Sequence, residues 1–278
     1  MRPPPRGGLH ERGIRMSPTD RLFTDGAAYE QLMGRWSRRV GDVFIEWLDA
    51  PRNLSWLDIG CGTGVFTEQI VQGCAPAAVL GIDPSPEQLA FAERRAGMRT
   101  AEFRVGDAQA LACPDDSFDV AVMALVIHFV PDPGRAVTEM ARVLRRGGWG
   151  AAYAWDFTRA GSPTAPLGVG MKAIGLQPSA PPSPDATALP ALEALWRSAG
   201  FVRIDTRTID IPVEFAGFDE FWTSMTVPVG PAGKAIAALP PDSRARLRST
   251  LQELMRPTAD GRIVYEARAN AVKGRKDG

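Results

Sequence analysis

The chain is poor in the residues that build covalently linked or metal-held sites. It has three cysteines and two histidines in 278 residues. Cys61, Cys74 and Cys113 are odd in number and show no CxxC spacing, and His10 and His128 lie far apart in the sequence. A disulfide framework and a zinc site are therefore not expected.

Net charge and long apolar runs are also lacking. Lys plus Arg and Asp plus Glu both number 32, so the formal net charge is zero and favours neither nucleic acid nor an anionic membrane. No apolar run approaches the ~20 residues that span a bilayer, and the N-terminus lacks the apolar core of a signal peptide. We expect a cytoplasmic protein that acts on a small molecule.

The first 16 residues, MRPPPRGGLHERGIRM, contain much Pro, Gly and Arg and little apolar surface. This composition predicts a disordered tail, or a translation start at Met16. We expect residues 17–278 to form a single domain, which suits the length of the chain. Within it, apolar residues at three- and four-residue spacing predict an amphipathic helical cap in the stretch 17–53.

Residues 54–156 alternate between short apolar runs and helical patterns. Strands are expected at LSWLDI, AAVLGID, TAEFRVGD, FDVAVMALV and GWGAAYAWD. The helix beginning near Pro133 is expected to close at the Gly147–Gly148 pair. Strand–helix alternation of this kind predicts an α/β fold with a doubly wound parallel sheet.

The stretch 157–245 begins with a segment rich in proline and glycine that cannot form one regular element. It then contains a helical pattern that ends near Gly200 and the alternating strand pattern FVRIDTRTIDIPVEF. Residues 246–278 read as a final helix and strand. We expect the two late strands to return to one sheet, with the stretch 157–245 serving as a variable lid over the substrate.

The stretch LSWLDIGCGTGVFTEQI places Gly60, Gly62 and Gly64 between a strand and a helix. Such a turn can be structural only, or it can let the backbone approach an anionic ligand at a helix N-terminus. Dinucleotide sites use GxGxxG, but Val65 stands where the third glycine would fall. Asp58 would repel a diphosphate there and suits a cationic group instead.

Two further acidic residues follow the next two predicted strands. Asp83 ends the second strand, where a carboxylate can accept both ribose hydroxyls, although DPSPEQ also resembles a helix N-cap. Asp107 follows the third strand, with the amide of Ala108 beside it, and is placed to face an adenine edge. These acids favour a nucleoside ligand with a cationic centre.

In this order and spacing, LDIGCGTG, GIDPS, GDAQAL, FDVAVMALVIHFVPD and RVLRRGG resemble the class I S-adenosylmethionine-dependent methyltransferases, and in particular the ubiquinone/menaquinone-biosynthesis type. The resemblance implies a Rossmann-like seven-stranded sheet of order 3-2-1-4-5-7-6 with strand seven antiparallel. N-terminal helices and a lid-like insertion before strand six would accompany this sheet. It covers about residues 54–150 and is weaker for the upstream MGRWSR.

The resemblance also implies roles for individual residues. The methionine part of S-adenosylmethionine would lie against Asp58, Gly60 and Gly62, and the ribose on Asp83. The adenine would lie between Asp107 with Ala108 and the side chain of Pro84 or Leu111. Upstream, Tyr29 and Arg35 match positions that close over the cofactor, and Arg35 could pair with its carboxylate. The product would be S-adenosylhomocysteine.

His128 lies after the fourth strand, at the edge where open sheets bind ligands. It can be a general base, or a packing residue beneath the cofactor. Five aromatic residues can line a substrate pocket or belong to the core, and the spacing favours the core: Tyr29, Trp36, Trp155, Phe221 and Trp222.

We therefore expect a methyltransferase that acts on an O, N or C atom of a small molecule. Two alternatives remain open at this point: a non-catalytic protein that binds or senses S-adenosylmethionine on the same fold, and a nicotinamide-dependent oxidoreductase. Asp58 and the missing third glycine weigh against the oxidoreductase.

Overall fold

The structure is a computed structural model that describes residues 33–278 except residues 96, 179 and 229. The predicted tail 1–16, Met16 and Tyr29 lie outside the described residues. No helix in the described part of the chain is long and apolar enough to cross a membrane.

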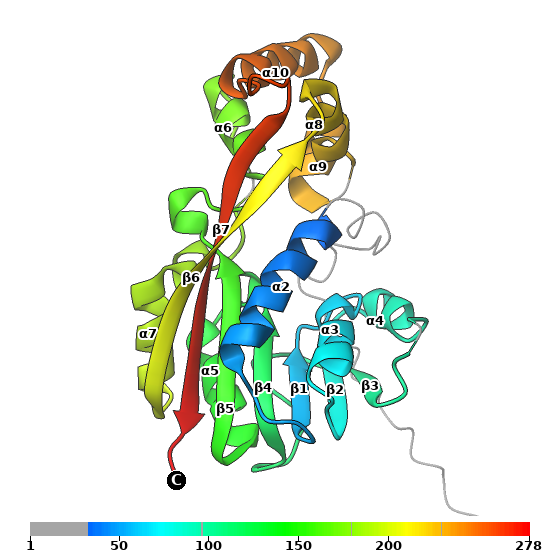
Figure 1. Ribbon diagram of the computed structural model, residues 1–278. Coiled ribbons are helices and arrows are strands. Elements are labelled where there is room, and N and C mark those ends of the chain that lie inside the picture. Colours follow the sequence, from blue (N-terminus) through cyan, green and yellow to red (C-terminus); the bar gives the residue numbers. More distant parts are fainter. Residues whose placement is uncertain (1–32, 96, 179, 229) are drawn as a thin grey trace, which may run out of the picture.

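Seven strands form one sheet in the order β3-β2-β1-β4-β5-β7-β6, as the resemblance implied (Figure 1). β1 to β5 pair in parallel, whereas β7 runs antiparallel to both β5 and β6. The strands are β1 (Ser55–Ile59), β2 (Ala78–Asp83), β3 (Ala101–Val105), β4 (Phe118–Ala124), β5 (Leu144–Trp155), β6 (Phe201–Phe215) and β7 (Ile263–Lys276).

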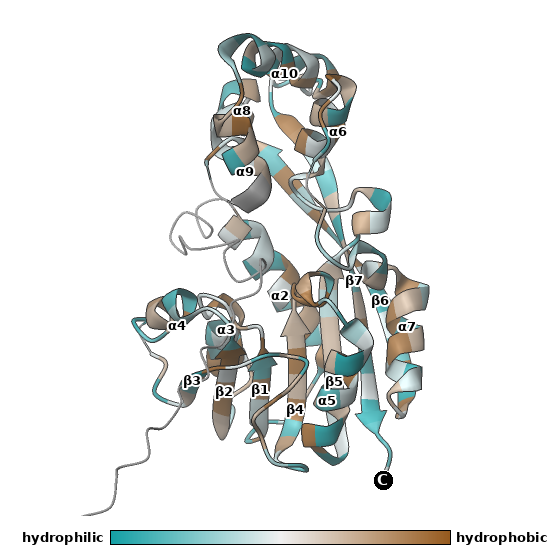
Figure 2. Ribbon diagram, turned by 180° about the vertical axis from the view of Figure 1, so that it is seen from behind, coloured by the Kyte–Doolittle hydropathy of each residue, from teal (hydrophilic) through white to brown (hydrophobic). Residues whose placement is uncertain are grey.

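A separate hydrophobic core covers each face of the sheet, because the central strands are apolar on both sides. In β4, Val120 and Val122 face one core while Ala121 and Met123 face the other. The helices are α2 (Arg35–Leu48), α3 (Val65–Gly73), α4 (Pro86–Ala92), α5 (Pro133–Val143) and α7 (Leu189–Ser198). α2 and α3 contribute to the first core, α5 and α7 to the second, on opposite faces in Figures 1 and 2.

The helix that begins at Pro133 ends earlier than the sequence predicts. α5 stops at Val143, and Leu144 already pairs with Phe118 as the first residue of β5. The Gly147–Gly148 pair lies in an irregular part of this strand, where the register against β4 shifts. The expectation was wrong because the glycine pair, which resembles a helix end, accommodates a bulge in a strand instead.

The last two strands extend far beyond the others and carry a group of helices at their far end (Figure 1). These helices are α6 (Ala165–Ala173), α8 (Phe218–Met225), α9 (Gly230–Ala237) and α10 (Pro241–Leu254). Only α6 precedes β6, and the other three lie between β6 and β7, so the insertion is divided by β6 rather than placed wholly before it. Within residues 157–245, α7 packs on the sheet. That this region forms a lid stays a prediction.

Candidate functional site

The loop between β1 and α3 is a tight turn that requires glycine. Gly60, Gly62 and Gly64 all have positive φ angles, of 76°, 54° and 77°. The Gly60 amide donates to the carbonyl of Ile82 over 2.6 Å, which ties the loop to the end of β2. A Cβ atom on Gly60 would lie 2.6 Å from the side chain of Val126, so no other residue fits.

Asp58 lies in β1, two residues before Gly60, and its side chain is fully buried. Its Oδ2 accepts a hydrogen bond from the Thr67 hydroxyl over 2.6 Å. Its Oδ1 is buried and has no hydrogen-bond partner among the described residues. Burial raises the pKa of Asp58 to about 7, an effect that the Thr67 bond opposes and the charge of Asp83 strengthens. The site therefore contains a buried carboxylate oxygen that lacks a partner.

Asp83 joins the glycine loop to the end of β2. Its Oδ2 accepts from the Gly62 amide and its Oδ1 from the Ser85 amide, both over 2.9 Å. The N-cap of α4 is Ser85, whose hydroxyl accepts from the Gln88 amide over 3.3 Å. Asp83 is thus not the helix cap, and its carboxylate is oriented by backbone amides on both sides.

The loop after β3 lies at the same edge of the sheet. The Gly106 amide donates to the carbonyl of Asp83 over 3.2 Å, which connects this loop to the end of β2. Asp107 is exposed and its Oδ1 accepts from the Gln109 amide over 2.9 Å. Ala108 is half-buried and Pro84 is exposed. The predicted adenine residues therefore follow β2 and β3 at the edge where Asp58 and Asp83 lie, while their ligand contacts stay predictions.

His128 lies in the short helix η3 (Ile127–Phe129), which follows β4. Its ring is buried between those of Phe129 and Phe157, with centroids 4.1 and 4.7 Å away, and its Nδ1 has no hydrogen-bond partner among the described residues. Burial lowers the pKa of His128 to about 3, so the imidazole is uncharged near neutral pH. These surroundings are typical of packing, and a role as general base stays a prediction.

Arg35 begins α2 and contacts the extended part of the molecule. Its guanidinium lies 4.4 Å from the ring of Trp36 and 4.7 Å from that of Phe215 in β6. It also pairs with Glu220 of α8 over 3.9 Å. A contact between Arg35 and the cofactor stays a prediction, and Tyr29 lies outside the described residues.

The remaining aromatic candidates belong to the core. Trp36, Trp155 and Phe221 are buried in the first core, and Trp222 packs against it. The helical and strand spacing had favoured this interpretation over a substrate pocket.

Thr67 is a site residue that the sequence analysis missed. It lies on the buried side of α3 between Phe66 and Ile70, and its hydroxyl holds Asp58. A polar residue on an otherwise apolar helix face was the available signal.

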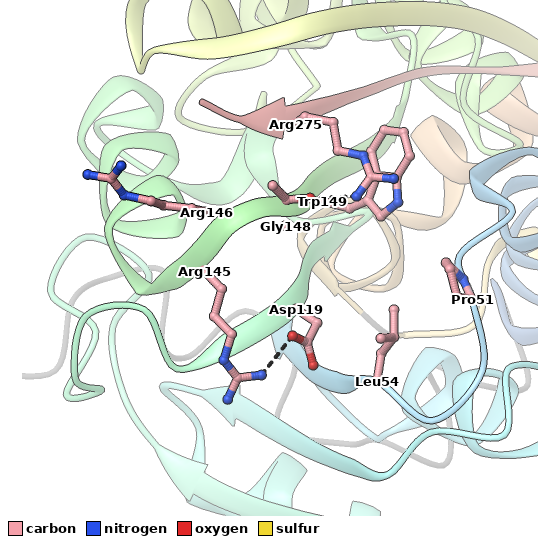
Figure 3. Close-up of a pocket in the computed structure, with 9 residues that line it drawn as sticks. Pro51, Leu54, Asp119, Arg145, Arg146, Gly148, Trp149 and Arg275 are labelled. Atoms are coloured by element: carbon pink, nitrogen blue, oxygen red, sulfur yellow. Dashed lines mark hydrogen bonds and ion pairs between the residues drawn. The ribbon is translucent and has the colours of Figure 1, made fainter. Parts of the chain in front are cut away.

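A shallow pocket at the opposite edge of the sheet contains none of the predicted site residues (Figure 3). There Arg145 pairs with Asp119 over 2.7 Å, and the guanidinium of Arg275 lies 3.6 Å from the centre of the Trp149 ring. Among the residues that the structure describes, no group of three or more His, Cys, Asp or Glu side chains could hold a metal ion.

Comparison with known proteins matches residues 57–152 to the family described as a methyltransferase domain. Over 116 residues the chain is 39% identical to the 2-methyl-6-phytyl-1,4-hydroquinone methyltransferase 2 of Oryza sativa, covering 41% of this chain and 33% of the relative. It is 37% identical over 116 residues to the demethylmenaquinone methyltransferase of Thermus thermophilus, covering 41% and 51%. The chain thus spans between a third and about half of the length of these relatives.

Solved structures share the fold at low identity. The YcgJ protein of Bacillus subtilis aligns with a TM-score of 0.59 at 18% identity, over 86% of this chain and 99% of the other. The phosphoethanolamine N-methyltransferase 2 of Haemonchus contortus, solved with S-adenosyl-L-methionine, aligns with a TM-score of 0.55 at 18% identity, over 91% and 57%. Residues 57–152, which contain most of β1 to β5, therefore match a methyltransferase domain, and the fold of the chain resembles that of these solved structures.

Proposed function

We propose that the chain transfers a methyl group from S-adenosylmethionine to a small-molecule acceptor and releases S-adenosylhomocysteine. The observation that carries this proposal is the glycine loop with its two carboxylates. Asp83 accepts from the Gly62 amide, and the buried Oδ1 of Asp58 has no hydrogen-bond partner among the described residues. Both lie within or at the end of strands of the methyltransferase domain.

The residues present fit this cofactor. Backbone amides of Gly62 and Ser85 orient the carboxylate of Asp83, and an ionised carboxylate suits ribose hydroxyls because its oxygens accept hydrogen bonds. The Oδ1 of Asp58 suits a cationic group, and the amino acid part of S-adenosylmethionine carries an ammonium. Pro84, Asp107 and Ala108 would border the adenine. Gly60 and Gly62 allow the backbone to approach the ligand closely, because neither has a side chain.

The bound cofactor supplies a methyl group on a sulfonium centre, and the chain's own residues orient and enclose it. The loop and Asp83 fix the ribose end, while the buried strand ends exclude water. His128 contributes an uncharged aromatic surface near this edge. With the pKa of His128 near 3, we expect acceptors that need no strong base, such as an activated carbon, a phenolate or an amine.

The relatives suggest which acceptors to test first. One of them is named as a methyltransferase of a hydroquinone and another as a demethylmenaquinone methyltransferase. We therefore propose a hydroquinone as the first acceptor, ahead of other phenols, amines and acids.

Calorimetric titration separates this proposal from its rivals. We expect S-adenosylhomocysteine to bind and NAD not to bind, because Asp58 opposes a diphosphate. A screen with S-adenosylmethionine labelled at the methyl group then tests transfer to hydroquinones, phenols and amines. Binding without transfer to any acceptor would favour the non-catalytic alternative, and binding of NAD alone would contradict the site assignment.

A further inference from the structure

Glu68, in the first turn of α3, forms ion pairs with two arginines from different parts of the chain. Its Oε2 accepts from Nη2 of Arg38 in α2 over 2.5 Å and from Nη1 of Arg95, which follows α4, over 3.0 Å. The side chains of Glu68 and Arg95 are only 16% and 10% exposed. Charge interactions in such surroundings are screened less than those at the surface.

Arg95 also reaches the glycine loop. Its Nε donates to the carbonyl of Thr63 over 2.5 Å, between Gly62 and Gly64. One guanidinium therefore bonds both the loop backbone and Glu68, and its planar fork fixes the angle between them. Moving either contact changes the other.

Helices α2 and α3 pack closely next to Glu68. The amide Nε2 of Gln69 donates to the carbonyl of Arg38 over 2.8 Å and to the carboxylate of Asp42 over 2.6 Å. A Cβ atom on Gly41 would lie 2.5 Å from the Gln69 amide oxygen. The two helices thus dock through polar groups at a position where α2 has no side chain.

The other part of α2 contacts the extended strands. Arg39 donates to the carbonyl of Pro212 over 3.2 Å, and the ring of Trp36 lies 5.8 Å from that of Phe215, both in β6. In Figure 1, α2 runs obliquely across the sheet, with α3 to one side and its upper end pointing toward α8 and α9. Through Glu68 and Arg95, α2 is therefore linked to the glycine loop, and its other contacts reach the region that we assign to the acceptor.

We propose that Glu68 is a positioning residue that couples the glycine loop to α2, with Arg95 as its contact to the loop and Arg38 as its contact to α2. The inference rests on the proposed function in that the loop is taken to bind the cofactor. Cofactor binding then orders α2, and by reciprocity the position of α2 affects cofactor affinity.

Three variants separate the contact to the glycine loop from the contact to α2, with S-adenosylhomocysteine as the probe. Arg95→Lys keeps the charge but loses the fork, so affinity falls about 3- to 10-fold. Arg38→Gln keeps the loop contact, so affinity changes less than about threefold, but the ligand no longer protects α2 from hydrogen exchange. Glu68→Gln shows both effects. Calorimetry gives the affinity, and mass spectrometry of the peptide covering residues 33–48 gives the protection.

Glu193→Gln is the matched control, because Glu193 also pairs with an arginine, Arg197, but on the surface of α7. Its affinity and its α2 protection should equal those of the unchanged protein, and thermal denaturation confirms that each variant folds. Equal affinity and equal α2 protection in all three test variants would overturn the inference. If Glu68→Gln lowered the affinity but the ligand still protected α2 from hydrogen exchange, the inference would also be overturned, since Glu68 would then only support the loop. If the unchanged protein fails to bind the probe, the proposed function itself is wrong.

Discussion

Carboxylates at the two edges of the sheet have opposite surroundings. At the edge with the glycine loop, Asp58 is fully buried, one of its oxygens has no partner within the described part of the chain, and burial raises its pKa to about 7. At the opposite edge, Asp119 accepts from Arg145 and from the Ser55 amide. Although burial opposes it, these bonds lower the pKa of Asp119 below its usual value.

The difference is between carboxylates whose oxygens accept from basic side chains and Asp58, whose Oδ1 has no hydrogen-bond partner among the described residues. Asp116 shows the paired type as well, since a hydrogen bond from Lys276 lowers its pKa. A paired carboxylate has its charge compensated within the chain, whereas Asp58 is costly to ionise until something cationic arrives. The predictions below test this contrast.

The largest effect is expected for Asp83→Ala. Losing charge-assisted bonds to both ribose hydroxyls costs about 3 to 6 kcal/mol, or roughly 10²- to 10⁴-fold in affinity for S-adenosylhomocysteine. Calorimetry measures this. Asp119→Ala, at the other edge, should leave the affinity within about twofold, and equal losses in both variants would remove the contrast.

The next effect concerns Asp58 and pH. Its folded-state pKa lies above the unfolded value near 3.8, so its contribution to stability is complete below pH 4 and is lost as the pH rises toward 7. About three pKa units correspond to at most about 4 kcal/mol. Urea denaturation of the ligand-free protein at several pH values should show this slope, and Asp58→Asn should flatten it. An unchanged slope in the variant would mean that Asp58 is not the titrating group.

His128→Ala should lower stability by about 2 to 4 kcal/mol, because it leaves a cavity between two aromatic rings. Affinity for S-adenosylhomocysteine should stay unchanged and turnover should fall. Because the pKa of His128 is near 3, we expect no ionisation near pH 6.5 in the pH profile of kcat. A step at that pH that disappears in the variant would instead establish His128 as a general base.

The smallest effect is expected for Asp119→Asn. Its partner Arg145 is 46% exposed, so solvent screens the pair and the loss should be about 1 kcal/mol. Because the folded-state pKa is lowered, this contribution is present above pH 4 and is lost as the pH falls. Its pH dependence is thus opposite in sign to that of Asp58, and the same urea measurements check it.

The parts of the fold and of the site that depend on residues close together in the sequence could be predicted from it. Strands β1 to β4 follow from short apolar runs, and the resemblance supplied the order of the sheet. The positions of Gly60 and Gly62 follow from one strand–turn–helix motif, and that of Asp83 follows from the end of the next predicted strand; the structure shows the hydrogen bonds that join them.

Other parts depend on partners that are distant in the sequence. Glu68 and Arg95 meet across 27 positions, and no local pattern marks them as partners. The glycine pair after α5 was misread because helix ends and strand bulges both accept glycine. Spacing also gave no hint that Arg35 would contact Phe215 in β6 and Glu220 in α8, which are 180 and 185 positions away in the sequence.

The long β6–β7 pair extends the first hydrophobic core beyond the rest of the sheet, where buried residues of α6, α8 and α10 join it. Ile209 of β6 pairs with Ala269 of β7 where β5 is still alongside, whereas Phe215 pairs with Ile263 at the end that carries α8 and α10. Both strands and the segment that contains α6 join the outer helices to the sheet, and Arg35 of α2 adds a contact to Glu220 of α8. Because α8, α9 and α10 form one contiguous segment between β6 and β7, chimeras cut at a matched register such as Phe215↔Ile263 can exchange these three helices together.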